Sequence, residues 1–221
     1  NKIVVDTFHT FMDNDFSVCR VNFRGVGKSD GEFDNGQGEL ADAAAALDWL
    51  ERENFDNSQC WVSGFSFGSL IAMQLLMRRP EINRFIAISP QPNVYDFSFL
   101  SPCPTSGLMI YGKKDELVPI ENIKELDTRL SAQKGIKVEF QSIPEANHFF
   151  SKNEEVLIKN LDKYIVYQGF KFENKHLQKE LSEFLIDRLK FYMKEGNIRN
   201  DIIQASVNSH NLDRLVIIFE K

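Results

Sequence analysis

A serine bracketed by two glycines, in the stretch WVSGFSFGSL (residues 61–70), has the spacing of a strained strand-to-helix turn. Ser66 lies where an apolar strand should end and a helix begin, and Gly64 and Gly68 stand two positions to either side. Small residues there relieve the crowding of so tight a turn, which lifts the serine hydroxyl clear of the sheet. The backbone N–H of Phe67 then lies at a helix start, where it can donate to an oxyanion. We therefore interpret Ser66 as a candidate nucleophile.

A serine hydroxyl is a weak nucleophile at neutral pH, so it needs a histidine base and a carboxylate that fixes the tautomer of that histidine. Asp115 in YGKKDELVP and His148 in PEANHFF each follow an apolar, strand-like run. We expect both to lie at the same edge of a parallel sheet as Ser66. The order Ser, Asp, His along the chain is that of the α/β-hydrolase arrangement. Glu116 and Asp96 remain alternatives for the carboxylate, because one is adjacent and the other also lies in a loop after a strand.

Other reactive residue types have plainer interpretations. Cys60 stands at the start of its predicted strand, which favours a place in the core over a nucleophilic role. His9 lies on an early helix, while His176 and His210 lie near the end of the chain, and we interpret all three as surface or packing histidines. The loop RGVGKSDG lacks the spacing of a phosphate-binding loop, so Arg24 is expected to be structural.

The elements that must position the three candidate residues alternate between strand and helix over most of the chain. Several of the strands are apolar on both faces, as expected when helices cover both sides of a parallel sheet. The predicted class is therefore α/β, with a mostly parallel sheet and helices on both faces. Hydrophobic spacing predicts helices over 2–13, 38–52, 67–78, 120–130 and 153–167, and strands over 17–23, 60–65, 84–89, 107–112 and 136–143.

Residues 1–165 resemble a small α/β-hydrolase of the dienelactone-hydrolase-like kind. The resemblance rests on four stretches that occur in order and at plausible spacing, NFRGVGKSDG, GFSFGS, YGKKDELVP and NHFF. It implies that Ser66 is the nucleophile, Asp115 the acid and His148 the base, and that the N–H of Phe67 is an oxyanion donor. It implies a small ester, thioester or amide substrate, as for a carboxylic ester hydrolase, and no metal or organic cofactor.

Two departures from the family pattern affect the expected site. The family begins with a strand and a loop that donates the second oxyanion N–H, whereas this chain starts at Asn1, almost directly in the helix that should follow that loop. We therefore expect the first strand to be missing and find no candidate for the second donor. The segment 90–105 leaves little room for a lid, which predicts an open site. Four phenylalanines flank the site and favour an apolar acyl group, although some of them must belong to the core: Phe65, Phe67, Phe149 and Phe150.

The last fifty residues follow a different pattern, and the acidic balance of the preceding part gives way to a nearly neutral one. We place a domain boundary near Gly169, between a hydrolase domain at 1–168 and an all-α tail at 169–221. Helices are predicted over 176–195, after a cap at Asp201, and along a final face that holds Leu212, Leu215, Val216 and Phe219.

The stretch LSEFLIDRLKFYMKEGNIRNDIIQASV (181–207) resembles part of the C-terminal region of the bacterial glycyl-tRNA synthetase β chain. This resemblance implies a fusion, and it leaves open an alternative function: an inactive hydrolase-like remnant joined to a fragment associated with tRNA aminoacylation. The Lys and Arg residues of the tail are interleaved with acids, which favours a solvated helical face over an RNA-binding patch.

Composition limits the remaining classes. The chain has 221 residues, 43% hydrophobic side chains and a formal net charge of −6, a globular composition whose acidity argues against nucleic acid or anionic membrane as the main partner. No apolar run reaches the roughly 20 residues of a membrane span, and no signal peptide is recognisable. Three widely spaced cysteines fit neither a disulfide framework nor a zinc site, which favours a reducing, cytoplasmic setting: Cys19, Cys60 and Cys103.

Overall fold

The computed structural model describes residues 1–54, 59–168, 203–206 and 214–220. Its helices are α1 (Lys2–Asp13), α2 (Gln37–Arg52), α3 (Phe67–Leu76), α4 (Ile120–Ser131) and α5 (Glu154–Gln168), with a short 3-10 turn at Ser98–Leu100. Its strands are β1 (Ser17–Asn22), β2 (Gln59–Phe65), β3 (Ile82–Ile88), β4 (Gly107–Gly112), β5 (Val138–Ile143), β6 (Ile203–Ser206) and β7 (Arg214–Glu220). The ten elements predicted up to residue 167 are all present, with shifts of a few residues at their ends.

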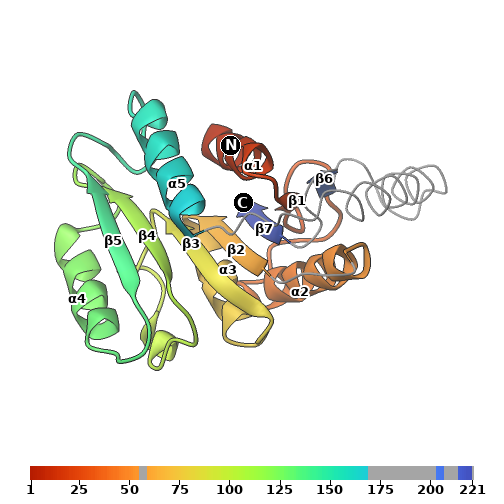
Figure 1. The fold of residues 1–221 in the computed structure, drawn as a ribbon, viewed down its shortest axis with the longest axis horizontal. Helices are drawn as coiled ribbons and strands as arrows, with labels where there is room; N and C mark the ends of the chain where they lie inside the picture. The colour runs from red at the N-terminus through yellow and green to blue at the C-terminus, as the bar shows by residue number, and fades with distance from the viewer. Residues whose placement is uncertain (55–58, 169–202, 207–213, 221) are drawn as a thin grey trace.

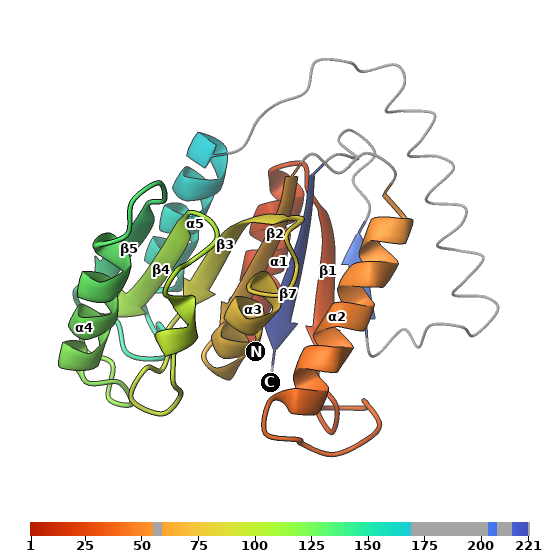
Figure 2. The same cartoon turned by 90° about the horizontal axis from the view of Figure 1, so that it is seen from below.

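The strands form one sheet in the order β5-β4-β3-β2-β7-β1-β6. Every neighbouring pair is parallel except β1 with β6, which is antiparallel. Helices α1 and α5 cover one face, and α2, α3 and α4 cover the other (Figures 1 and 2). The predicted α/β class, with a mostly parallel sheet between two helical layers, is confirmed. No helix in the described ranges is long and apolar enough to cross a bilayer.

Each face of the sheet has its own hydrophobic core, because successive side chains of a strand point to opposite faces. Val62 of β2 packs into the core beneath α2, α3 and α4, whereas its neighbour Trp61 packs into the core beneath α1 and α5. The Trp61 ring meets the rings of Phe16 and Phe11 edge-on, at centroid distances of 5.3 and 5.8 Å. Burial on both faces makes β2 a rigid support for the residue that follows it.

Strand β7 lies in the middle of the sheet, where it pairs in parallel with β1 on one side and β2 on the other (Figure 2). Its Ile218 and Phe219 are 1% and 0% exposed, and the Phe219 ring stacks on Phe23 at 5.6 Å. The sheet is therefore continuous from β1 through β7 to β2. The absence of the first strand that the family pattern led us to expect leaves no gap between them.

Two of the three helix predictions for the tail are wrong, the one after Asp201 and the one along the final apolar face. Residues 214–220 form a strand, although Leu212, Leu215, Val216 and Phe219 have helical spacing, and residues 203–206 form the edge strand β6. The physical reason is the run of β-branched residues at 216–218, which suits a strand, together with a place between two parallel strands that requires apolar residues on both faces. The helix predicted at 176–195 lies outside the described residues, and the boundary near Gly169 stays a prediction.

Candidate active site

Ser66 lies between the end of β2 and the first residue of α3, in a backbone conformation that L-residues rarely adopt. Its φ of 55° and ψ of −119° make the sharp turn that the sequence predicted. The turn is held from both sides: the N–H of Ser66 donates to the carbonyl of Ile88 at 2.8 Å, and the Ser69 hydroxyl donates to the carbonyl of Ser66 at 2.6 Å. These hydrogen bonds fix the direction of the Ser66 side chain.

The two elbow glycines are required by close backbone approaches. A Cβ at Gly64 would clash with the backbone carbonyl of Gly68, across the turn. A Cβ at Gly68 would stand 2.6 Å from the carbonyl oxygen of Phe219, on the neighbouring strand β7. Gly64 therefore allows β2 to turn into α3, and Gly68 allows α3 to pack against β7.

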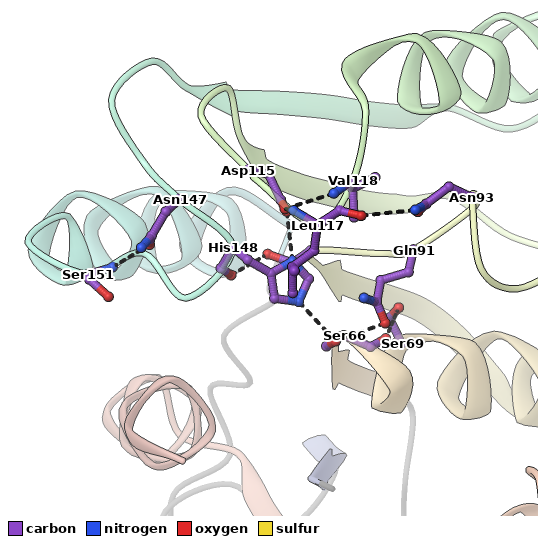
Figure 3. Close-up of polar contacts among 11 residues, drawn as sticks. Ser66, Ser69, Gln91, Asn93, Asp115, Leu117, Val118, Asn147, His148 and Ser151 are labelled. Atoms are coloured by element: carbon purple, nitrogen blue, oxygen red, sulfur yellow. Dashed lines mark hydrogen bonds and ion pairs between the residues drawn. The ribbon is translucent and has the colours of Figure 1, made fainter.

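The structure brings the three predicted residues into one hydrogen-bonded line (Figure 3). Nε2 of His148 lies 3.0 Å from Oγ of Ser66, and Nδ1 of His148 lies 2.7 Å from Oδ2 of Asp115. The side chains of His148 and Asp115 are only 1% and 4% exposed. The other carboxylate oxygen of Asp115, Oδ1, accepts from the backbone N–H groups of Leu117 and Val118 at 2.8 and 3.0 Å. Burial and these bonds hold the carboxylate in one orientation toward the imidazole.

Loops after β4 and β5 deliver the acid and the base to the same edge of the sheet. The turn after β4 is tied to the loop after β5, because the N–H of Lys114 donates to the carbonyl of Ala146 at 2.9 Å. The Ser89 hydroxyl, from the end of β3, donates to the carbonyl of His148 at 2.9 Å. The side chain of Asn147 accepts from the N–H of Ser151 at 2.9 Å and closes the turn that carries His148.

Neither alternative carboxylate lies in this line. Asp96 accepts at 2.7 Å from both the N–H and the hydroxyl of Ser98, and these hydrogen bonds lower the pKa of the Asp96 carboxyl. Glu116 is exposed. Asp115 is the carboxylate that contacts the imidazole, as the sequence predicted in preference to both.

Gln91 is a neighbour of Ser66 that the sequence did not single out. Its side-chain Oε1 lies 3.1 Å from Oγ of Ser66 (Figure 3). Gln91 stands three residues beyond the end of β3, in the stretch SPQPN. The available signal was its position at the carboxyl edge of a parallel strand next to β2, where functional side chains gather.

Aromatic rings surround the imidazole and the elbow. The rings of Phe65 and Phe149 lie 5.5 and 5.1 Å from the His148 ring, and Phe67 is in edge contact with Phe33 and Tyr95 at 5.4 and 5.6 Å. Phe33 and Phe149 are 46% and 48% exposed, so they offer apolar surface to solvent. Phe150, which was predicted with them, is fully buried and belongs to the core.

Of the other residues weighed from the sequence, those that the structure describes lie outside the hydrogen-bonded line of Ser66, His148 and Asp115. Arg24 makes a bidentate ion pair with Asp42 of α2, at 2.8 Å for each bond, which raises the pKa of the guanidinium. His9 is exposed on α1, while His176 and His210 lie outside the described residues. Cys60 is 1% exposed, and burial raises the pKa of its thiol, so its assignment to the core is confirmed. Within the described ranges, no cluster of three or more His, Cys, Asp or Glu side chains could hold a metal ion.

Comparisons with known proteins agree with this architecture. Residues 7–107 match the α/β hydrolase fold family. A protein of Rickettsia prowazekii is 48% identical over 170 residues, which are 75% of this chain and 71% of the relative. The crystal structure of a putative α/β hydrolase from Agrobacterium tumefaciens is 49% identical, with a TM-score of 0.74 over 75% of this chain and 76% of that one. A lidless serine hydrolase from Xanthomonas campestris is 25% identical, with a TM-score of 0.66 over 78% and 76%. The chain belongs to the α/β hydrolase superfamily.

Proposed function

We propose that the chain is a serine hydrolase that cleaves a small ester, thioester or amide through an acyl-enzyme on Ser66. The observation that carries this proposal is the hydrogen-bonded line from Ser66 Oγ through His148 to Asp115, with atoms 3.0 and 2.7 Å apart. A nucleophile, a base and an orienting carboxylate at hydrogen-bond distances are the components of acyl transfer.

The proposed first step is attack of Ser66 Oγ on the substrate carbonyl carbon while Nε2 of His148 takes the hydroxyl proton. Nδ1–H of His148 donates to Asp115, which stays ionised and stabilises the imidazolium as it forms. The protonated Nε2 then gives its proton to the leaving oxygen, sulfur or nitrogen, and the acyl group remains on Oγ. Water, deprotonated by the same Nε2, hydrolyses the acyl-enzyme and restores Ser66.

The N–H of Phe67 is the proposed oxyanion donor, because Phe67 is the first residue of α3. The N–H groups of a first helical turn point out of the helix, and the helix dipole favours negative charge there. Loss of one such donor costs about 10²–10³ in rate in other acyl transferases.

The surroundings of Ser66 favour an apolar acyl group in a substrate of the carboxylic ester class. Phe149 and Leu117 lie next to residues of the proposed site, and their side chains are 48% and 45% exposed. Among the hydrogen bonds of the described residues, those of the His148 ring involve one charged side chain, that of Asp115. Burial of apolar surface of the acyl chain against the Phe149 and Leu117 side chains would supply binding energy at about 25 cal/mol per Å².

Labelling with a fluorophosphonate probe, followed by intact-mass measurement, tests the proposal. We expect a single adduct on the wild-type chain, none on Ser66→Ala, and an unchanged adduct on Ser131→Ala, a matched change at an exposed site on α4. A folded wild-type chain without an adduct would favour the inactive alternative, a hydrolase-like chain whose tail resembles glycyl-tRNA synthetase. That resemblance falls mostly on residues outside the described ranges and stays a prediction.

A further inference from the structure

Gln91 has a place next to the nucleophile that the proposed reaction does not yet use. Resting on the proposed function, we propose that Gln91 is a positioning residue for Ser66. Its side-chain amide donates an N–H to Oγ when Nε2 of neutral His148 accepts the hydrogen bond of the Ser66 hydroxyl. The starting observation is that Oγ of Ser66 has two partners, Nε2 of His148 at 3.0 Å and the side-chain amide of Gln91 at 3.1 Å.

The number of protons at the site limits how these two contacts can be made. A serine hydroxyl has one proton to donate and two lone pairs that accept. With Oε1 of Gln91 facing Oγ, the hydroxyl proton is directed to Gln91, and the contact with His148 then requires a donor at Nε2. Because Nδ1 must also donate to the Asp115 carboxylate, that arrangement belongs to the protonated imidazole, in which both ring nitrogens are donors.

The reactive form needs the opposite arrangement. Nδ1 of neutral His148 donates to Asp115, so Nε2 is an acceptor and the Ser66 hydroxyl donates its hydrogen bond to it. An amide oxygen at 3.1 Å from Oγ would then face another acceptor. A half-turn of the side-chain amide exchanges Oε1 and Nε2 of Gln91 and places an N–H there instead.

An N–H from Gln91 would act on Oγ in both halves of the reaction. It occupies one of the two lone pairs, so the other remains for attack on the substrate carbonyl carbon. In deacylation, the bond from Oγ to the acyl carbon breaks and the electron pair returns to Oγ, which the same N–H stabilises until His148 returns the proton. Gln91 contacts Ser66 rather than the reacting carbon, so its effect is transmitted through the nucleophile.

Two substitutions separate this role from a structural one. Gln91→Met keeps a similar length without a hydrogen bond, and Gln91→Glu keeps the shape but offers only acceptors when ionised. Gln74→Glu, on α3, introduces the same charge away from Ser66 and is the control. The measurement is the second-order rate constant of fluorophosphonate labelling across pH 5–10, together with the thermal unfolding midpoint of each variant.

We expect Gln91→Met to label about tenfold more slowly with an unchanged pH midpoint, which is the loss of one hydrogen bond. Gln91→Glu should label more slowly still near neutral pH, with its midpoint moved upward, because a second carboxylate near His148 favours the protonated ring. Gln74→Glu should match the wild type.

Labelling of Gln91→Met within twofold of the wild type would overturn the proposal. So would an unmoved pH midpoint in Gln91→Glu, or slower labelling that follows only a lower unfolding midpoint. If instead the wild-type chain does not label, or Ser66→Ala still labels, the proposed hydrolase function fails and the Gln91 proposal fails with it. A wild-type chain that labels beside Gln91 variants that label equally well removes the Gln91 proposal alone.

Discussion

At the scale of single residues, the two oxygens of Asp115 have separate partners. Oδ1 accepts from the N–H groups of Leu117 and Val118, and Oδ2 faces Nδ1 of His148. An asparagine at this position would keep its oxygen on the two backbone donors and turn its NH₂ toward Nδ1. The imidazole would then accept at Nδ1 and carry its proton on Nε2, where it cannot take the Ser66 proton.

Asp115→Asn is therefore expected to slow fluorophosphonate labelling of Ser66 by up to about 10⁴-fold, through the wrong tautomer, with little loss of stability. Labelling kinetics and a thermal unfolding curve measure both effects. Glu116→Gln is the matched control, because it removes the same charge from the adjacent exposed position. Equal rates for Asp115→Asn and the wild type would show that Asp115 does not orient the base.

Gly64 has a structural role that can be tested independently of activity. A side chain there would collide with the backbone of Gly68, which cannot move without shifting the start of α3. We expect Gly64→Ala to lower the free energy of unfolding by about 1–3 kcal/mol and to abolish labelling. Gly135→Ala has open space around the added methyl group and bears only the cost of its positive φ. A Gly64→Ala chain as stable and reactive as the wild type would contradict this account of the elbow.

The candidate site was predictable from the sequence where a reactive residue type stood within a few residues of a strand's end. Ser66, Asp115 and His148 each follow an apolar run, and the topology of a parallel sheet brings such positions together. Gln91 follows a strand as well, but a glutamine in a loop has many uses, and its contact with Ser66 depends on the path of that loop. Spacing along the chain could not supply that path.

At the scale of elements, β7 is the part of the fold that the sequence did not reveal. Apolar residues at positions 212, 215, 216 and 219 fit a helical face, while the run at 215–219 also fits a strand buried on both sides. Short apolar runs leave this choice open, and the tertiary context decides it. Here the choice depends on pairing with β1 and β2, which lie about 200 and about 155 residues earlier in the chain.

Because β7 lies inside the sheet, we expect a single substitution in it to lower the free energy of unfolding strongly. Phe219 is fully buried, stacks on Phe23 and presents its carbonyl to Gly68. Phe219→Ala should lower the free energy of unfolding by about 3–5 kcal/mol in urea titrations, through lost burial and a cavity. Tyr167→Ala on α5, where the side chain is 82% exposed, should change it by less than about 0.5 kcal/mol. A Phe219→Ala chain no less stable than this control would place β7 outside the sheet.

At the scale of the whole molecule, the alternation of strands and helices was enough to predict the sheet and its two helical layers. The apolar character of β2 and β3 on both faces carried that prediction, because only a sheet covered on both sides buries such strands. What alternation could not predict is how the far end of the chain enters the sheet. Through β7, residues near the end of the chain pack into both cores: Phe219 lies in one core, and Ile218 lies in the other with Ile3 of α1.

The core beneath α2, α3 and α4 also buries thiols, and their ionisation makes the stability of the molecule fall at alkaline pH. Burial raises the pKa of the Cys19 thiol to about 12 and also raises that of Cys60. Below the ordinary thiol pKa of about 8.5 both states are protonated and the thiols contribute no difference. Above it the unfolded chain loses these protons while the folded chain keeps them, so stability falls as pH rises toward the folded values.

We expect the free energy of unfolding in urea, measured under reducing conditions, to fall between pH 8 and pH 10 by an amount that depends on these thiols. Each contributes about 1.4 kcal/mol per pH unit once the unfolded thiol is ionised. Cys19→Ala together with Cys60→Ala will lower stability at every pH through cavities, so the readout is the slope with pH rather than its value. The slope should flatten in the double variant. An equal slope in both chains would show that other groups cause the alkaline loss and that the two thiols ionise alike in the folded and unfolded states.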